Sequence, residues 1–169
     1  MRFRNCHSGS IADWLPNHFY SEKQCGGGAM IDLGAHGMYL TEWILGVPNT
    51  ARSVFTVSHE NPRNVDGVED NAVTVMGFSD GAIAINETGF VSGISPVVLE
   101  VYGENGYVRM ENNTVVKCTR ATEKAVVEVA LPDSLPIPIV QFLTGNILPG
   151  CSIKEAKALT RMMTMAYKK

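Results

Sequence analysis

Short segments rich in valine and isoleucine recur along the middle of this chain, and they constrain its fold more than any other feature. Apolar and polar residues alternate within them with a period of roughly two, which is typical of β-strands. The segments are 51–60, 70–79, 82–91, 97–103, 107–110, 114–120 and 124–131. Turn residues such as Ser79-Asp80-Gly81 and Asn112-Asn113 separate several of them. Connections this short make neighbouring strands antiparallel, so a meander is expected.

A different periodicity predicts helices on either side of these strands. Apolar residues surround nearly the whole circumference of a helix at 29–45, which predicts a largely buried helix that ends at Gly46. A short helix is expected at about 139–147. The last helix begins at a capping box formed by Ser152 and Glu155.

Together these elements predict one α+β domain over residues 1–169. We expect a single open, largely antiparallel sheet of about six strands, including a short strand at 2–8, with helices packed on one face. Two helices and a short one cannot shield both faces of so wide a sheet, and an exposed apolar face is a common contact surface. The second face is therefore expected to form a homo-oligomer contact.

The composition argues against several classes of partner and location. A formal net charge of −3 without clustered lysine or arginine argues against nucleic acid and anionic membrane as partners. The chain has no apolar run that could cross a bilayer and no secretory signal pattern at its start, so a cytoplasmic protein is expected. Four cysteines lack metal-binding spacing and are expected to be free thiols: Cys6, Cys25, Cys118 and Cys151.

Asp32 and His36 are the residues best suited to chemistry. Four positions apart on the predicted helix, they project from one face, because their directions differ by roughly 40°. Such groups in an apolar helix cost free energy to bury unless they pair or meet a ligand. The imidazole can transfer a proton near neutral pH, and the carboxylate can orient it or hold a substrate hydroxyl. Judged from spacing alone, an aspartate and a histidine four positions apart more often form a structural hydrogen-bonded pair than an active site. A metal-dependent hydrolase is a further alternative, but it would need a third metal ligand, and no motif in the sequence supplies one.

Glycines surround this pair. Gly34 and Gly37 lie inside the predicted helix, where glycine is about 1 kcal/mol less favourable than alanine, so close approach by a strand or a ligand is expected. The run Gly26-Gly27-Gly28 lacks the third glycine and the preceding apolar strand of a dinucleotide-binding loop. It is predicted to be a flexible helix entry, with Gly28 placed to contact a ligand.

Other residues are secondary candidates. His7 ends the first predicted strand and is expected either to face the same pocket as the pair or to lie at the surface. The acidic residues Asp66, Glu69 and Asp70 are expected in a solvated loop. The eight methionines are expected to fill the core.

The residues from Gly26 to His36, GGGAMIDLGAH, continue to WILG at 43–46 and resemble a signature of the glucose-fructose oxidoreductase and inositol dehydrogenase family (Gfo/Idh/MocA). Further matches extend the likeness over nearly the whole chain: EDNA at 69–72, SDGA at 79–82, VYGENG at 101–106 and SIKEA at 152–156. All of them correspond to the second, carboxy-terminal domain of the family.

The resemblance implies the substrate-side half of a two-domain oxidoreductase that acts on a sugar, a polyol or a related hydroxy or keto substrate. NAD or NADP would be bound mainly by an amino-terminal Rossmann domain absent from this chain, and no cofactor is expected on the chain alone. Asp32 resembles the substrate-orienting carboxylate and His36 the proton-transfer residue, while His7 resembles a substrate contact. The family's catalytic lysine in a Glu-Lys-Pro motif is missing, so the chain alone is not expected to turn over. The alternative is a non-catalytic binding or oligomerisation module of the same fold.

Overall fold

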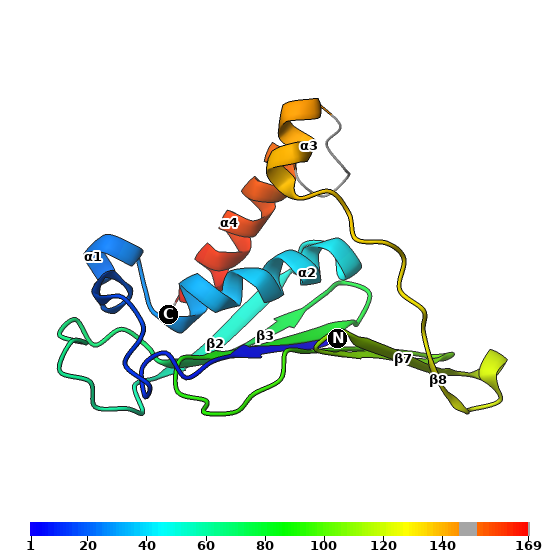
Figure 1. The fold of residues 1–169 in the computed structure, drawn as a ribbon, viewed down its shortest axis with the longest axis horizontal. Coiled ribbons are helices and arrows are strands. Elements are labelled where there is room, and N and C mark those ends of the chain that lie inside the picture. The colour runs from blue at the N-terminus through cyan, green and yellow to red at the C-terminus, as the bar shows by residue number, and fades with distance from the viewer. Residues whose placement is uncertain (146–151, 169) are drawn as a thin grey trace.

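The computed structural model describes residues 1–145 and 152–168, and its centre is one eight-stranded sheet (Figure 1). The strands lie side by side in the order β2-β3-β4-β1-β5-β6-β7-β8. Their bounds are β1 Arg2–Cys6, β2 Thr50–Thr56, β3 Asn71–Gly77, β4 Ile83–Gly89, β5 Val98–Gly103, β6 Gly106–Glu111, β7 Thr114–Thr119 and β8 Val126–Glu128. The prediction of a single open α+β sheet is confirmed, but the number of about six strands was wrong.

The strand number exceeds the prediction because every short hairpin adds its strand to the same sheet. Strands β5 to β8 follow one another through short connections, and each pairs antiparallel with its neighbour. Strand β1 departs from a meander, because it lies between β4 and β5, parallel to the first and antiparallel to the second. The loop at 90–97 carries the chain around the end of β1, which therefore lies inside the sheet.

Helices cover one face of one half of the sheet (Figure 1). A single turn, α1 Glu22–Cys25, precedes a π-helical turn at Met30–Gly34, which continues directly as α2 Ala35–Leu45. Helices α3 Pro138–Thr144 and α4 Ile153–Tyr167 follow the strands. Helix α2 packs on β4 and β1, and α4 packs on α2 and β2. The short helix predicted at about 139–147 is confirmed over its described part, while residues 146 and 147 lie outside the described residues.

The predicted ends of the two longer helices have clear physical causes. Gly46 adopts a left-handed backbone conformation with φ of 84°, which residues with a Cβ rarely adopt, and α2 ends there. At the start of α4, the Ser152 hydroxyl accepts a hydrogen bond from the Lys154 N–H at 3.2 Å. The Glu155 carboxylate accepts one from the Ser152 N–H at 2.9 Å. The predicted capping box is therefore confirmed.

The core between the helices and the sheet is rich in methionine, as predicted. The buried residues of this cluster are Met30, Met38, Ala72, Met76, Ala84, Met162, Met163 and Ala166. Methionine is unbranched and flexible, so it fills the irregular space where crossing helices meet a twisted sheet. A second buried cluster lies beneath the irregular segment 8–20 and consists of Leu15, Tyr20, Ala29, Leu33 and Phe90.

The helix at 29–45 was predicted to be largely buried, and this is wrong for its outer side. Trp43 is 66% exposed and Ile44 is also exposed, whereas Met38 and Thr41 on the inner side are buried. The strands and α4 contact only part of the circumference of this helix, so its remaining apolar residues face outward. An apolar pattern around a whole helix gives no information on which side has a packing partner.

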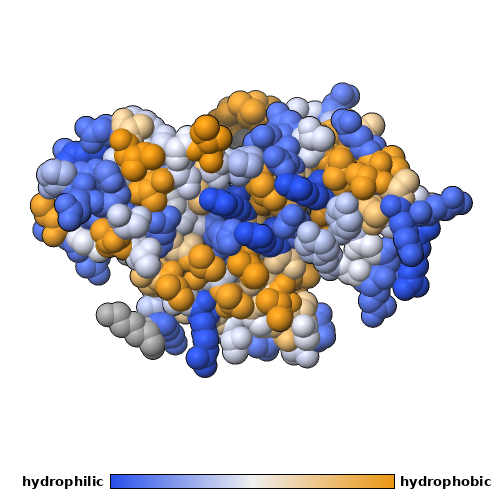
Figure 2. All heavy atoms as spheres, turned by 90° about the horizontal axis from the view of Figure 1, so that it is seen from below, coloured by the Kyte–Doolittle hydropathy of each residue, from blue (hydrophilic) through white to orange (hydrophobic). Residues whose placement is uncertain are grey.

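The strands beneath the helices carry several β-branched residues on the side away from the helices. In β3 and β4, buried Thr74 faces the π-helical turn and buried Asn86 faces this turn and α2, while Val73, Val75 and Ile83 alternate with them and are exposed. Figure 2 shows this open face, on which apolar side chains gather around a few charged ones. Exposed β-branched residues on a broad sheet face are typical of a protein contact surface.

Two further features concern the environment of the chain. Within residues 1–145 and 152–168, no helix has the length and apolar character needed to span a membrane. Cys6, Cys25 and Cys118 are free thiols. The fourth cysteine, Cys151, lies outside the described residues.

We expect the chain to self-associate through the open sheet face. Light scattering should therefore give a mass of two or more chains, because a second copy would bury Val73, Val75 and Ile83. Val75→Lys would place a charge in this contact and weaken association on the order of tenfold or more. Val65→Lys, at a loop position that is 84% exposed, is the matched control and should leave the mass unchanged. A monomer at high concentration would contradict this expectation.

Candidate active site

Residues distant in sequence hold the start of the helix that carries Asp32. The Met30 N–H donates to Oε1 of Glu69 at 3.0 Å, and the Ala29 N–H donates to the Glu69 carbonyl at 2.8 Å. The Tyr167 hydroxyl, at the end of α4, donates to the same Oε1 at 2.6 Å. The pKa of Tyr167 is raised mainly by burial and, to a smaller extent, by this hydrogen bond to Glu69. Its hydroxyl therefore keeps its proton at neutral pH. The Glu69 carboxylate also complements the positive end of the helix dipole.

The helix begins with one π-helical turn, Met30–Gly34, and only then becomes α-helical. π-Helical turns are rare in proteins, and those that do occur are frequently found at functional sites. The Gly34 carbonyl accepts a hydrogen bond at 2.7 Å from Nδ2 of Asn86, a fully buried residue of β4. The strand thus supplies a side-chain donor to the widened turn and fixes the turn against the sheet.

Glycines permit this close contact. A Cβ on Gly37 would lie 2.1 Å from Oδ1 of Asn86, and a Cβ on Gly28 would lie 1.9 Å from the carbonyl oxygen of Glu69. A Cβ on Gly34 would lie 2.2 Å from Sδ of Met30, one turn earlier in the helix. The predicted close approach by a strand is confirmed at Gly37, whereas at Gly34 the neighbour is the side chain of Met30 in the same helical segment. A contact between Gly28 and substrate stays a prediction.

Asp32 and His36 lie on the part of the helix that faces away from the sheet. Asp32 belongs to the π-helical turn and is half-buried, whereas His36, in the first turn of α2, is exposed. Within the part of the chain that the structure describes, no hydrogen bond or ion pair joins these two residues, and neither bonds to another side chain. An ionisable pair without structural bonds is available to a ligand.

His7 follows β1 and belongs to the same region. Its ring stacks on the buried ring of Phe90, with centroids 5.0 Å apart, and its Nδ1 accepts a hydrogen bond from the Gly9 N–H at 3.0 Å. In the neutral ring the proton is therefore on Nε2. Burial lowers the pKa of His7, and the negative charge of Asp32 opposes this shift. The two side chains are thus within electrostatic reach of each other.

The carboxylate of Asp32 also acts on Cys25. Burial raises the pKa of the Cys25 thiol, and the charge of Asp32 adds to this effect. The charge of Asp32 therefore acts on both His7 and Cys25, and His36 lies one helical turn further along the helix. A carboxylate beside a neutral imidazole N–H can bind a hydroxyl group from both sides, and an exposed imidazole can exchange a proton with it.

The glycine run before the helix does not form a phosphate cradle. A Cβ on Gly27 would lie 2.3 Å from the Tyr167 hydroxyl, so this residue packs against protein. The N–H groups of Ala29 and Met30 at the helix start already donate to Glu69. An anion at a helix start needs such N–H groups unpaired. This helix start therefore does not fit the pyrophosphate of a dinucleotide.

A metal centre and a surface groove are the other kinds of site that a chain of this fold could carry. In residues 1–145 and 152–168, no three His, Cys, Asp or Glu side chains gather closely enough to hold a metal ion. A groove of about 390 Å³ lies between β2 and the end of α4, with Phe55 and Tyr167 among its lining residues. Neither Asp32 nor His36 lines it. The groove results from the crossing of α4 over an edge strand, so the ionisable groups define the candidate site better.

Two acidic residues expected in a solvated loop are buried instead, so that prediction was wrong. Glu69 is 7% exposed and Asp70 3%, while Asp66 is exposed as predicted. The Asp70 carboxylate accepts hydrogen bonds from the N–H groups of Ser58 and His59 at 2.8 and 2.7 Å. No signal in the sequence indicated this burial, because the N–H groups that need these acceptors belong to segments that meet Glu69 and Asp70 only in the folded chain.

Comparisons with known proteins give a family and a fold. The family model described as GFO/IDH/MocA C-terminal domain matches residues 2–109. A search of curated protein sequences found no match. The resemblance predicted from the glycine-rich helix motif is thus confirmed at the level of the family.

Solved structures with the same fold are about twice as long as this chain. A protein described as an NADPH-dependent oxidoreductase from Desulfitobacterium hafniense has a TM-score of 0.80 at 14% identity, over 98% of this chain and 52% of its own. An NAD binding oxidoreductase from Klebsiella pneumoniae has a TM-score of 0.74 at 17% identity, and the match covers 98% of this chain and 55% of its own. UDP-N-acetylglucosamine 3-dehydrogenase from Acidithiobacillus ferrooxidans has a TM-score of 0.70 at 14% identity, and the match covers 97% of this chain and 50% of its own. At these identities the likeness shows the fold alone.

Gly37→Ala should destabilise the chain although alanine is the better helix former. The new Cβ would overlap the Asn86 side chain, and overpacking of this kind costs about 1–3 kcal/mol. This exceeds the gain in helix propensity of about 1 kcal/mol. Urea unfolding measures the difference. Gly103→Ala is the matched control, because no atom lies within 4 Å of its added Cβ. Equal stability of the two variants would contradict the close contact.

His7 should titrate below the ordinary histidine pKa of 6.5, because burial disfavours its charged form. Below pH 6.5, His7 then binds protons more readily in the unfolded chain than in the folded one. The contribution of His7 to the free energy of unfolding is therefore fully present above pH 6.5 and decreases as the pH falls below that value. NMR titration of the His7 ring protons measures the midpoint. Asp32→Asn should lower it further by removing the opposing charge, whereas Asp66→Asn, at an exposed acid, should not. An unchanged midpoint in Asp32→Asn would show that the two residues are not neighbours.

Proposed function

Because this chain belongs to the GFO/IDH/MocA C-terminal domain family, we propose that it is the substrate-side half of an NAD(P)-dependent oxidoreductase. The substrate class proposed is a sugar, a polyol or a related hydroxy or keto compound. The observation that carries the proposal is the pair of Asp32 and His36 at the junction of the π-helical turn and α2, which makes no side-chain hydrogen bond or ion pair within residues 1–145 and 152–168. The similarity in fold to a UDP-N-acetylglucosamine 3-dehydrogenase supports the sugar class.

In this proposal the residues of the chain handle the substrate hydroxyl and its proton. Asp32 accepts a hydrogen bond from the reacting hydroxyl and orients it. His36 takes the hydroxyl proton when the carbon is oxidised and returns it when the carbonyl is reduced. His7 donates its Nε2–H to a neighbouring oxygen, and Gly28 lies at the edge of the substrate.

The cofactor belongs to a different part of the proposed enzyme. When bound, the oxidised nicotinamide of NAD or NADP would accept a hydride from the substrate carbon, and the reduced nicotinamide would supply one in the reverse direction. Since the helix start does not fit the pyrophosphate of the cofactor, a separate Rossmann domain would hold most of the nucleotide. This chain alone is accordingly proposed to be inactive, and calorimetric titration of it with NADH or NADPH should give weak binding or none.

A second candidate function is a non-catalytic binding or oligomerisation module. The exposed residues Val73, Val75 and Ile83 on the open sheet face favour it, because such a face is stabilised by a partner. The two candidates differ in what they require of the helix. A module needs neither the Asp32 carboxylate nor the His36 imidazole, whereas the oxidoreductase needs both.

His36→Ala separates the two candidates in a protein that joins this chain to a nicotinamide-binding domain. Loss of a positioned acid–base group should lower kcat by about 100-fold or more. His18→Ala, which removes an exposed histidine of the irregular segment, is the matched control and should retain activity. Steady-state kinetics and thermal denaturation of both variants give the comparison. Full activity of His36→Ala would contradict the catalytic assignment.

A further inference from the structure

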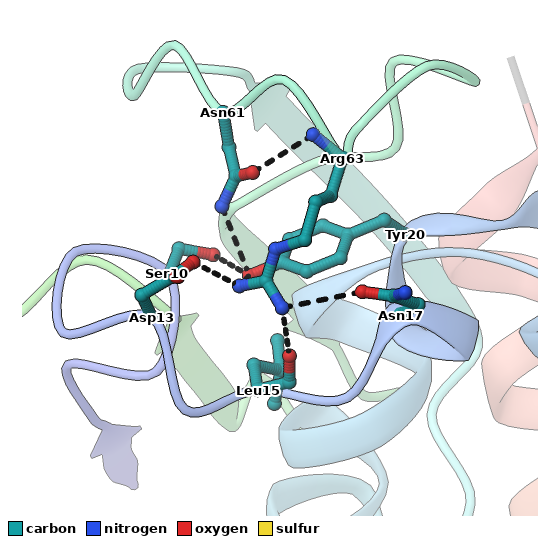
Figure 3. Close-up of polar contacts among 7 residues, drawn as sticks. All are labelled: Ser10, Asp13, Leu15, Asn17, Tyr20, Asn61 and Arg63. Atoms are coloured by element: carbon teal, nitrogen blue, oxygen red, sulfur yellow. Dashed lines mark hydrogen bonds and ion pairs between the residues drawn. The ribbon is translucent and has the colours of Figure 1, made fainter.

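The irregular segment at 8–20 presents a tryptophan and holds it in place. Trp14 is 56% exposed, but both of its neighbours in sequence are fixed. The Asp13 carboxylate pairs with Nη2 of Arg63 at 2.5 Å, and the Leu15 carbonyl accepts from Nη1 of the same guanidinium at 2.8 Å (Figure 3). Trp14 is therefore an exposed aromatic residue on an anchored backbone.

Arg63 is itself held on several sides. Its guanidinium lies over the ring of Tyr20, 4.9 Å from the centroid. Its backbone N–H donates to Oδ1 of Asn61 at 2.9 Å, and the Asn61 amide donates to the Tyr20 hydroxyl at 3.2 Å (Figure 3). Ser10 lies 3.0 Å from the same hydroxyl. Because Tyr20 is buried, this cluster connects the segment around Trp14 to the core.

The backbone beside the tryptophan is strained. Asp13 has a φ of 58°, in the left-handed region that residues with a Cβ rarely adopt. The guanidinium of Arg63 contacts the turn at two points, the Asp13 carboxylate and the Leu15 carbonyl. Strained residues of this kind persist where the surrounding structure requires them, frequently at ligand sites.

Trp14 adjoins the candidate active site through His7. The two ring centroids are 4.7 Å apart, with the planes inclined by 50°. His7 is supported from another side by Phe90, and the charge of Asp32 acts on it. An exposed aromatic face, an imidazole N–H and a carboxylate therefore belong to one neighbourhood.

We propose that Trp14 is the stacking platform of a carbohydrate or cyclitol subsite whose polar side is formed by His7 and Asp32. The inference rests on the proposed function and adds the residue that recognises the substrate ring. The face of an indole is electron-rich and attracts the weakly positive C–H groups on one face of a pyranose or cyclitol ring. The hydroxyls at the ring edge then meet a donor at His7 Nε2 and an acceptor at Asp32.

Arg63 is a positioning residue in this subsite. It holds Asp13 and Leu15 on either side of Trp14 and makes no contact with the sugar. Tryptophan has only two side-chain torsions, so a fixed backbone leaves the indole with little freedom to lose on binding. The clamp thus lowers the entropic cost of stacking.

NMR titration of the 169-residue chain tests the platform directly, because the chain has only two tryptophans. Their indole N–H signals are assigned with Trp14→Phe and Trp43→Phe. Methyl β-D-glucopyranoside and myo-inositol, added to tens of millimolar, should shift the Trp14 signal to saturation. Glycerol has hydroxyls but no ring face and is the control ligand, expected to have little effect. Trp43, which is 66% exposed on α2, is the matched control residue and should not shift.

Variants test the division of roles. Trp14→Ala should raise the dissociation constant, followed at the backbone amides of residues 30–36, on the order of tenfold. Trp43→Ala should leave it unchanged. Arg63→Met should broaden the Trp14 indole signal and weaken binding while the signals of buried Met38 and Met76 stay in place. If Arg63→Met does not fold, Asp13→Asn removes the ion pair alone and should have the same effect to a smaller extent.

The outcomes distinguish the platform from the proposed function. Saturable shifts of the helix amides at 30–36 without a shift of Trp14 would overturn the platform and leave the proposed function standing. Shifts of Trp14 without any at 30–36 would support a sugar subsite but contradict the role of Asp32. Equal shifts of Trp14 and Trp43, or none at Trp14, would overturn the inference.

Discussion

The close contact between the helix at 29–45 and the strands beneath it is the constraint on which the rest of the structure depends. Gly28 and Gly37 leave room for the Glu69 backbone and the Asn86 side chain at distances that a Cβ would prevent. Asn86 and Glu69 then bond to the helix, one at the Gly34 carbonyl and the other at the Met30 N–H. These bonds fix a π-helical turn, and this turn carries Asp32. The position of the Asp32 carboxylate is therefore a consequence of backbone packing.

The same contact explains the unusual distribution of residues in the sheet. Strands that lie so close to a helix need small or hydrogen-bonding residues on the facing side, and Thr74 and Asn86 meet that need. The alternation of the pleat then places Val73, Val75 and Ile83 on the other side, where they are exposed. The open face therefore presents apolar side chains to solvent, and it is the surface that we expect to contact a second copy.

The candidate site combines segments that are far apart in sequence. His7 reaches it from the end of β1, and Asp32 from the helix. The loop before β3 contributes Glu69, which anchors the helix start, and Arg63, which anchors the segment around Trp14. None of these loops could hold its position by local structure alone, because each depends on a buried partner from another segment. A rigid arrangement of this kind allows an exposed aromatic ring and a half-buried carboxylate to act on one ligand.

The sequence by itself determined the class of fold, the ends of the main helices and the family. Strand alternation, short turns, capping residues and the glycine-rich helix motif are local patterns, and local patterns report local backbone preferences. It also indicated Asp32 and His36, because ionisable groups in an apolar helix stand out against their neighbours. Their catalytic role stays a prediction.

Tertiary structure alone decided where those elements meet. It placed β1 between β4 and β5, exposed Trp43, buried Glu69 and Asp70, and stacked His7 on Phe90. It also decided that Asp32 and His36 share no hydrogen bond within the described residues, although their spacing allows one. The physical reason is that burial and pairing are properties of contacts between distant segments. A pattern along one segment contains no information on which partner that segment will meet.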